Sequence, residues 1–415
     1  IFQFIGADAH SLPLLNLAGP MTGLLIQPII GALSDRTWSP RWGRRKPFFL
    51  IGAIGCSICL FLFPFVTAIW MAVMLLWLLD ASNNTAMEPY RAFIADRLPP
   101  AQLGKGFLAQ SFFTGLGITL ANLSLMFFQG VFGLGQSVGI PLWVYPAFLL
   151  GSVCSIATVL ISVLSTPELE PTEKELAELR ASKGGPGHFI AEIKDAIVDM
   201  PVEMRKLALV YLFQWYAMNI YWQYVSLSVS QSLYGTTDAR SEGYQLAVAN
   251  TGVINGAYNI VTFCVAFGLV ALARRLGAKW VHAIALWCAT VGLLLFPQLP
   301  TLPLKVVAIV GLGIAWASIM GVPYIMIVRM VPSTRYGVYM GIVNMMIVIP
   351  MLIQTLTFGA IYKNLLGDNP NNAIMAAGIL LGIAGLVMLW VKEPPIVRDI
   401  EPVGSGDETV TTKGA

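Results

Sequence analysis

Long apolar segments, each about the length of a membrane-spanning helix, repeat along almost the whole chain; 47–67 and 279–298 are examples. A bilayer core needs about 20 apolar residues in a helix. Only helices and closed barrels satisfy every backbone N–H and C=O group in that setting. Charged residues make up 11% of the chain, against about 25% in soluble proteins. The sequence therefore predicts an all-α integral membrane protein.

The apolar segments predict a series of helices separated by polar or basic turns. The predicted helices cover 11–34, 47–67, 69–96, 105–130, 139–165, 206–233, 244–273, 279–298, 304–330, 337–362 and 371–391. The opening residues IFQFIG continue an apolar pattern, so 1–6 are interpreted as the end of a first helix largely missing from this sequence. We then expect two six-helix bundles.

Composition divides the chain into four parts. An N-terminal helix bundle is expected over 1–165 and a C-terminal helix bundle over 206–392. The polar linker 166–205 between them is predicted to hold an amphipathic helix near 188–199, and 393–415 is a polar tail. Two helical halves joined by a polar loop are typical of a transporter that rocks around a site at the bilayer midplane.

Lysine and arginine are distributed unevenly between the two sets of loops. Of the 25, 21 fall in the loops that include the central linker and the tail, Arg91 lies within a helix, and three fall in the opposite loops: Arg240, Lys305 and Lys363. Positive residues concentrate on the cytoplasmic side of membrane proteins. The central loop and the C-terminus are therefore predicted to be cytoplasmic.

The predicted helix 69–96 carries ionisable residues in its middle, Asp80, Glu88 and Arg91. A charge at membrane depth costs about 2.5–3.5 kcal/mol by insertion scales, so it persists where it faces water or a partner. Asp80 and Arg91 are 11 residues apart, nearly three turns, which places them on one helix face about 16 Å apart. The pair indicates a substrate or proton site; a buried ion pair that only locks helices together is the structural alternative.

The turn GALSDRTWSPRWGRRK follows the first complete predicted helix. Asp35 ends that helix and can pair with the basic residues of the turn, and Arg41, Arg44 and Arg45 can reach acids and carbonyls at neighbouring helix ends. The turn resembles the loop signature of the major facilitator superfamily. The resemblance implies a latch on the cytoplasmic gate, with Asp96 as the natural partner; a topology signal alone is the alternative.

Other segments resemble a narrower group, the sucrose transporter branch close to the glycoside–pentoside–hexuronide cation symporters. They are GPMTGLLIQPIIGALSDR, LLDASNNTAMEPYRAFIAD, MPVEMRKLALVYLFQWYAMNIYW and GVYMGIVNMMIVIPMLIQ. The resemblance implies sugar transport, often with a proton, in which Asp80 is the proton site and Arg91 engages the sugar or that acid. Glu88 departs from the plant pattern of a small residue, and it adds a second candidate carboxylate beside Arg91.

Amide and aromatic residues inside other predicted helices could complete a sugar site. Aromatic faces stack on the CH groups of a sugar, and amides bond its hydroxyls. For each residue the alternative is helix–helix hydrogen bonding or an interfacial position. The substrate-binding candidates are Asn84, Arg91, Gln214, Trp215, Asn219, Trp222, Gln223, Asn255, Tyr258, Asn259 and Asn344.

No nucleotide motif, catalytic constellation or metal site is predicted, and the cysteines are interpreted as core residues. The predicted function is secondary active transport of a disaccharide, of sucrose or maltose type, by proton symport. A proton-independent facilitator or exporter and a non-transporting sugar receptor remain as alternatives. No cofactor and no nucleic acid are expected; the proton is the expected coupling ion. We predict a monomer in the plasma membrane, of bacterial inner-membrane type.

Overall fold

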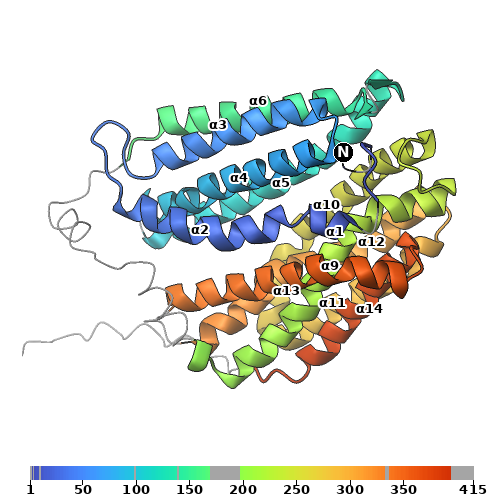
Figure 1. Ribbon diagram of the computed structural model, residues 1–415. Coiled ribbons are helices and arrows are strands. Elements are labelled where there is room, and N and C mark those ends of the chain that lie inside the picture. The colour runs from blue at the N-terminus through green and yellow to red at the C-terminus, as the bar shows by residue number, and fades with distance from the viewer. Residues whose placement is uncertain are drawn as a thin grey trace, which may run out of the picture.

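The computed structural model describes residues 2, 4–8, 11–97, 100–137, 140–168, 197–331 and 336–393. In this part of the chain all regular structure is helical apart from one short hairpin, β1 (Gln136–Ser137) and β2 (Ile140–Pro141). The helices form two groups lying side by side, one from each half of the chain (Figure 1).

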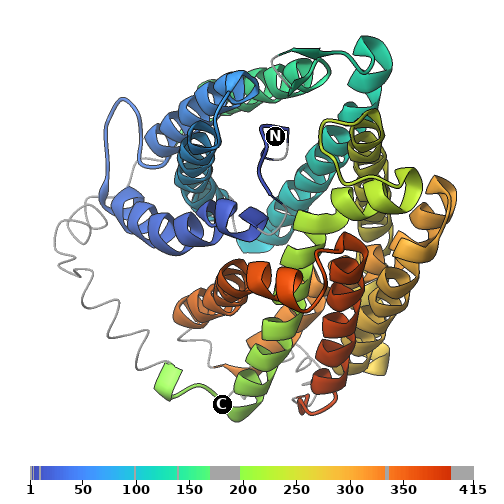
Figure 2. The same cartoon turned by 45° about the vertical axis from the view of Figure 1, so that its right-hand side comes forward.

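The N-terminal half contains five long helices among the described residues. They are α2 (Ala18–Arg36), α3 (Lys46–Leu62), α4 (Ile69–Arg97), α5 (Pro100–Phe132) and α6 (Val144–Ser165), with a short α1 (Leu12–Leu15) before them and a 3-10 turn, η2 (Phe63–Phe65), after α3. α3 packs between α4 and α6, and α2 packs on α4. In Figure 2 the N-terminal end of the chain lies inside the ring that these helices form.

The described residues of the C-terminal half form six long helices. They are α9 (Val202–Tyr234), α10 (Glu242–Leu276), α11 (Ala278–Leu295), α12 (Leu302–Met330), α13 (Tyr336–Asn364) and α14 (Pro370–Met388), with η3 (Phe296–Gln298) after α11. α14 packs against α9 and α11, and α12 packs against α10 and α11. α9 lies at the centre of this half, and most of its side chains are buried.

Eight helices among the described residues are long and apolar enough to cross a membrane. α4 and α9 have 29 and 33 residues, which also suffices for a bilayer at about 1.5 Å per residue. Their apolar runs are interrupted by amides, acids and aromatic hydroxyls, which are the residues that the sequence assigned to a site. The helical membrane architecture predicted from the apolar segments is confirmed.

Local chemistry sets several helix boundaries. The Ser241 hydroxyl accepts from Tyr244 N at 3.1 Å to cap α10, and the Asn369 side chain caps α14 in the same way. Gly235 ends α9 in the left-handed conformation, with φ 66°. Several predicted boundaries differ from those of the structure by up to five residues, and two predicted helices are interrupted or begin differently. The helix expected over 11–34 breaks at Asn16–Leu17, and 139–165 starts with the hairpin before α6 begins at Val144.

Lys305 was assigned to a loop, but it lies in the first turn of α12 with its side chain fully buried. Its ammonium donates to the Phe296 carbonyl at 2.6 Å and lies 4.6 Å from the Phe296 ring centroid. Carbonyls at the end of a helix lack intrahelical donors, and a lysine can supply one. Lys305 therefore ties the start of α12 to the end of α11.

Contacts between the two halves gather at one end of the molecule. We call this end the far end and the opposite one the basic end. The basic end carries the turn with Arg41, Arg44 and Arg45, the turn before α11, and the segment after α14. At the far end, Gln129 donates to the Gln245 carbonyl at 2.9 Å, and Phe4 contacts the Tyr244 ring edge-on. α13 also packs against α1 and α2.

Candidate functional site

Asn84 organises the polar contacts between α4 and α2. Its side-chain oxygen accepts from Gln27 Nε2 at 2.7 Å, and its Nδ2 donates to Thr22 Oγ1 at 3.1 Å and to the Asp80 carbonyl at 2.9 Å. The side chain is 7% exposed. An amide with all of these partners is held in one orientation, so Asn84 fixes the geometry of the α4 face on which Asp80 lies.

The Asp80 side chain is half-buried on α4 beside the backbone of α2, because a Cβ placed on Gly19 would lie 3.7 Å from Asp80 Oδ2. No hydrogen bond or ion pair joins this carboxylate to a described side chain. Glu88, Arg91 and Asp96 occupy α4 positions, and Asp35 occupies an α2 position. The side chains of these four residues lie outside the described part, so their predicted contacts remain predictions.

Three tryptophans meet between α9 and α12. The Trp316 ring centroid lies 5.7 Å from that of Trp215 and 5.3 Å from that of Trp222, both in edge-on geometry. Trp222 Nε1 donates to the Tyr258 hydroxyl at 3.4 Å. Trp215 is 6% exposed, and its indole N–H has no hydrogen-bond partner among the described residues. The structure thus brings together Trp215, Trp222 and Tyr258, which were predicted from the sequence, and adds Trp316.

Trp316 lies on a different face of α12 from the exposed residues Leu304 and Val307. Trp316, Met320 and Tyr324 follow one another at intervals of four, so they share a face, and Met320 is exposed. The exposed Leu304 and Val307 lie on another face of the same helix. The tryptophan cluster therefore borders a second accessible surface of the C-terminal half.

Amides join α9 to α13. Asn219 Nδ2 donates to Gln354 Oε1 at 2.6 Å, and Gln354 Nε2 donates to Gln223 Oε1 at 3.3 Å. Asn219 and Gln354 are buried, whereas Gln223 is half-buried. Asn344 is half-buried on the same α13. In this conformation Asn219 contributes to packing between helices, and Gln223 is the more accessible amide of the group.

The remaining predicted amides make contacts within the C-terminal half. Tyr221 donates to Asn255 Oδ1 at 2.8 Å, and Asn259 Nδ2 donates to the Asn255 carbonyl at 2.8 Å. Gln214 Oε1 lies 3.0 Å from Nε2 of His282, whose Nδ1 lies 2.8 Å from Ser318 Oγ. Among the described side chains, no hydrogen bond links the candidates of this half to Asp80 or Asn84.

A glutamate that was not predicted as part of the gate binds the basic turn of the N-terminal half from another segment of the chain. Glu168, three residues after α6, accepts from the backbone N–H groups of Arg44, Arg45 and Lys46, the last at 2.8 Å. These N–H groups open α3, where the helix dipole favours a negative charge. The buried Arg45 guanidinium donates to Ser34 Oγ at 2.7 Å. The turn is therefore tied to α2 and to the end of α6.

The C-terminal half repeats this arrangement. Glu393, just after α14, accepts from Ala278 N at 2.9 Å and from Lys279 N at 3.3 Å, at the start of α11. Each turn has a glycine at positive φ, Gly43 at 76° and Gly277 at 93°. A Cβ on Gly43 would lie 2.5 Å from the nearest carboxyl atom of Glu168, and one on Gly277 would lie 2.8 Å from that of Glu393. Glycine is needed at both positions because the carboxylate occupies the space of a side chain.

Changing Gly43 to alanine should destabilise the protein more than changing Gly133 to alanine. Both glycines have positive φ, 76° and 68°, but only Gly43 has a group within 4 Å of the added Cβ. The backbone conformation costs about 1–2 kcal/mol in each variant, and Gly43→Ala also displaces Glu168. We expect Gly43→Ala and Glu168→Gln each to lower the thermal midpoint by several degrees in detergent. Equal midpoints for Gly43→Ala and Gly133→Ala would contradict the role of Glu168.

Sequence analysis did not predict four features: the contacts made by Trp316, Glu168 and Glu393, and the burial of His282. Trp316 stands alone in an apolar helix, and no spacing links it to α9. Both glutamates directly follow a helix that precedes a polar segment, TPELEP and VKEPP, so they look like the first solvated residues. The available signal was the parallel between the two halves, in which each basic turn contains a glycine and each last helix is followed by a glutamate.

Comparisons with known proteins agree with the fold. The Major Facilitator Superfamily model matches residues 1–238 and 207–407. The sucrose transport protein SUT5 of Oryza sativa subsp. indica is 25% identical, covering 97% of this chain and 85% of the relative. The sucrose transport protein SUC4 of Arabidopsis thaliana is 24% identical, covering 91% and 82%.

Two solved structures share the architecture. A point mutant of the nucleoside transporter NupG has a TM-score of 0.71 at 14% identity, covering 94% of this chain and 93% of that one. The D-xylose-proton symporter has a TM-score of 0.65 at 17% identity, covering 93% and 89%. At these identities the likeness concerns the fold alone. Because the family model matches nearly the whole chain, this protein belongs to the Major Facilitator Superfamily.

Proposed function

We propose that this membrane transporter carries a disaccharide of sucrose or maltose type by proton symport. The observation that carries the proposal is the cluster of Trp215, Trp222 and Trp316, in which the buried indole N–H of Trp215 has no partner in the described part of the chain. Indole faces suit the CH groups of a sugar ring, and the N–H can donate to a hydroxyl. The similarity to sucrose transport proteins supports the same substrate class.

The N-terminal half supplies the other part of the proposed site. Arg91 donates to sugar hydroxyls, and Asn84 holds the α4 face in place through α2. Asp80 or Glu88 carries the coupled proton. The gate at the basic end uses Asp35 and Asp96 with Arg41, Arg44 and Arg45, and this end faces the cytoplasm of a bacterial inner membrane. One chain is the working unit.

Two other functions would use the same architecture. A facilitator or exporter would need no proton gradient, and a sugar receptor would bind without moving its ligand. The half-buried carboxylate of Asp80, which has no ion pair to a described residue, favours symport over both. A permanently paired acid would be poorly placed to take up and release a proton.

Uptake into proteoliposomes tests the function directly. Purified protein is reconstituted, and labelled sucrose, maltose, xylose and a nucleoside are compared at two external pH values, with and without a proton ionophore. We expect disaccharide accumulation that the ionophore abolishes. Ionophore-insensitive equilibration would indicate a facilitator, and saturable binding without counterflow would indicate a receptor. Transport of the nucleoside or xylose in preference to the disaccharides would contradict the substrate assignment.

Replacing Trp215 by phenylalanine should weaken sugar binding while leaving the fold intact. The change keeps an aromatic ring at a 6% exposed position and removes the unpartnered N–H. A neutral hydrogen bond contributes about 0.5–1.5 kcal/mol, so the Kd should rise roughly two- to thirteenfold. The matched control is Trp143→Phe, which removes another buried, unpartnered indole N–H, at the start of α6. Equal effects of the two variants would contradict a specific contact.

A further inference from the structure

Stripes of exposed apolar side chains run along the neighbouring helices α11 and α14, and each ends in a tryptophan. The members are Trp280, Ile284 and Val291 on α11, and Ile379 and Leu386 on α14, followed by Trp390 two residues after α14 ends. Intervals of four and seven keep such residues on one helix face. Because α11 packs against α14, the stripes form one apolar surface with both tryptophans at the basic end.

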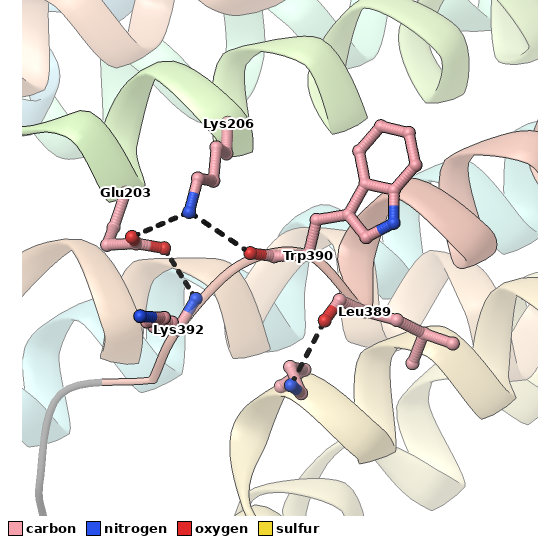
Figure 3. Close-up of polar contacts among 6 residues, drawn as sticks. Glu203, Lys206, Leu389, Trp390 and Lys392 are labelled. Atoms are coloured by element: carbon pink, nitrogen blue, oxygen red, sulfur yellow. Dashed lines mark hydrogen bonds and ion pairs between the residues drawn. The ribbon is translucent and has the colours of Figure 1, made fainter.

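Three lysines gather around the same end of α14 (Figure 3). Lys279 Nζ donates to the Leu389 carbonyl at 3.2 Å and lies 5.7 Å from the Trp280 ring centroid. Lys206 Nζ donates to the Trp390 carbonyl at 3.3 Å and to Glu203 at 2.8 Å. An ammonium has three N–H donors, so both lysines keep capacity for a further acceptor.

The two carboxylates in this cluster, those of Glu203 and Glu393, already accept hydrogen bonds. Glu203 accepts from Lys206 Nζ and from the Lys392 backbone N–H. Partial burial acts to raise the pKa of Glu203, but these hydrogen bonds and the lysine charges outweigh it and hold the pKa below its ordinary value. Glu393 accepts from the backbone at the start of α11. Within this cluster three lysines, Lys206, Lys279 and Lys392, outnumber these two carboxylates.

We propose that this surface, Trp280 and Trp390 with Lys279 and Lys392, binds an anionic phospholipid. The acyl chains would lie along the apolar stripes of α11 and α14. The two indoles would sit at the level of the glycerol, where tryptophan is enriched in membrane proteins. The phosphate would accept from the lysines, which carry the charge complementary to an acidic leaflet. The inference does not depend on which solute the protein transports.

Lipid titration of the purified full-length protein, followed by native mass spectrometry, tests the proposal. Phosphatidylglycerol should bind more tightly than phosphatidylcholine at low salt, and the preference should shrink as salt screens the charges. Each removed lysine should weaken phosphatidylglycerol binding roughly fivefold, so Lys279→Gln with Lys392→Gln should weaken it about 25-fold. Trp280→Leu with Trp390→Leu should also weaken it.

Trp70 provides the matched control, because it is 65% exposed at the far end of α4 and no Lys or Arg stands between Lys46 and Arg91 in the sequence. Trp70→Leu should leave phosphatidylglycerol binding unchanged. Equal affinity for the two lipids, an equal loss in Trp70→Leu, or displacement of the lipid by millimolar inorganic phosphate would overturn the proposal. If the double lysine variant does not fold, the exposed Lys392→Gln alone should still give the roughly fivefold loss.

Discussion

Replacing Gly252 by leucine is expected to slow transport strongly without unfolding the protein. Gly252 is where α10 of the C-terminal half crosses α5 of the N-terminal half: a Cβ there would overlap the Asn122 carbonyl, and one on Gly256 would lie 3.0 Å from Leu123. Side chains forced into a close contact cost about 1–3 kcal/mol, which shifts the balance between conformations roughly 5- to 150-fold. We therefore expect transport to fall by a similar factor.

A distance measurement and a control variant separate this effect from general damage. Spin labels at the exposed Phe132 and Asp238, at the far end of each half, should move apart in Gly252→Leu. Gly268→Leu is the control, because Gly268 lies on the same helix with nothing within 4 Å of an added Cβ. A variant that folds, keeps its label distance and transports like the wild type would show that the α5–α10 contact does not limit the conformational cycle.

Replacing Asp80 by asparagine should abolish accumulation driven by a proton gradient while sparing exchange of sugar. Asparagine resembles the protonated acid but cannot release a proton. For one coupled proton, a gradient of one pH unit supports about tenfold accumulation. In Asp80→Asn the ratio of internal to external sugar should therefore fall to about one, with counterflow retained. Both are measured in the same proteoliposomes.

The matched controls are Glu242→Gln, which removes an exposed acid from the first turn of α10, and Glu88→Gln. The first should accumulate sugar like the wild type. Loss of coupling in Glu88→Gln alone would assign the proton to the other α4 acid. Wild-type uptake that is independent of the gradient would instead favour a facilitator, with Asp80 as a fixed sugar ligand or ion-pair partner.

The sequence by itself determined the membrane architecture and pointed to the helices that carry the candidate site. Apolar length decides which segments can cross a bilayer, and that property is local, so α3 and α11 were placed within a few residues. The polar interruptions in α4 and α9 were equally visible. Choosing Asn84, Trp215 and Trp222 as candidates required only that polar and aromatic residues in such helices usually face a partner or a cavity.

Only the tertiary structure decided what those residues contact. Helical periodicity gives the face of a residue but not its neighbour, so Asn219 and Gln214, chosen as sugar contacts, were found buried against Gln354 and His282. Glu168 caps α3 across 122 residues of sequence from Lys46. Nothing local in a polar loop specifies that contact: it arises because folding brings the end of α6 beside the open N–H groups that begin α3.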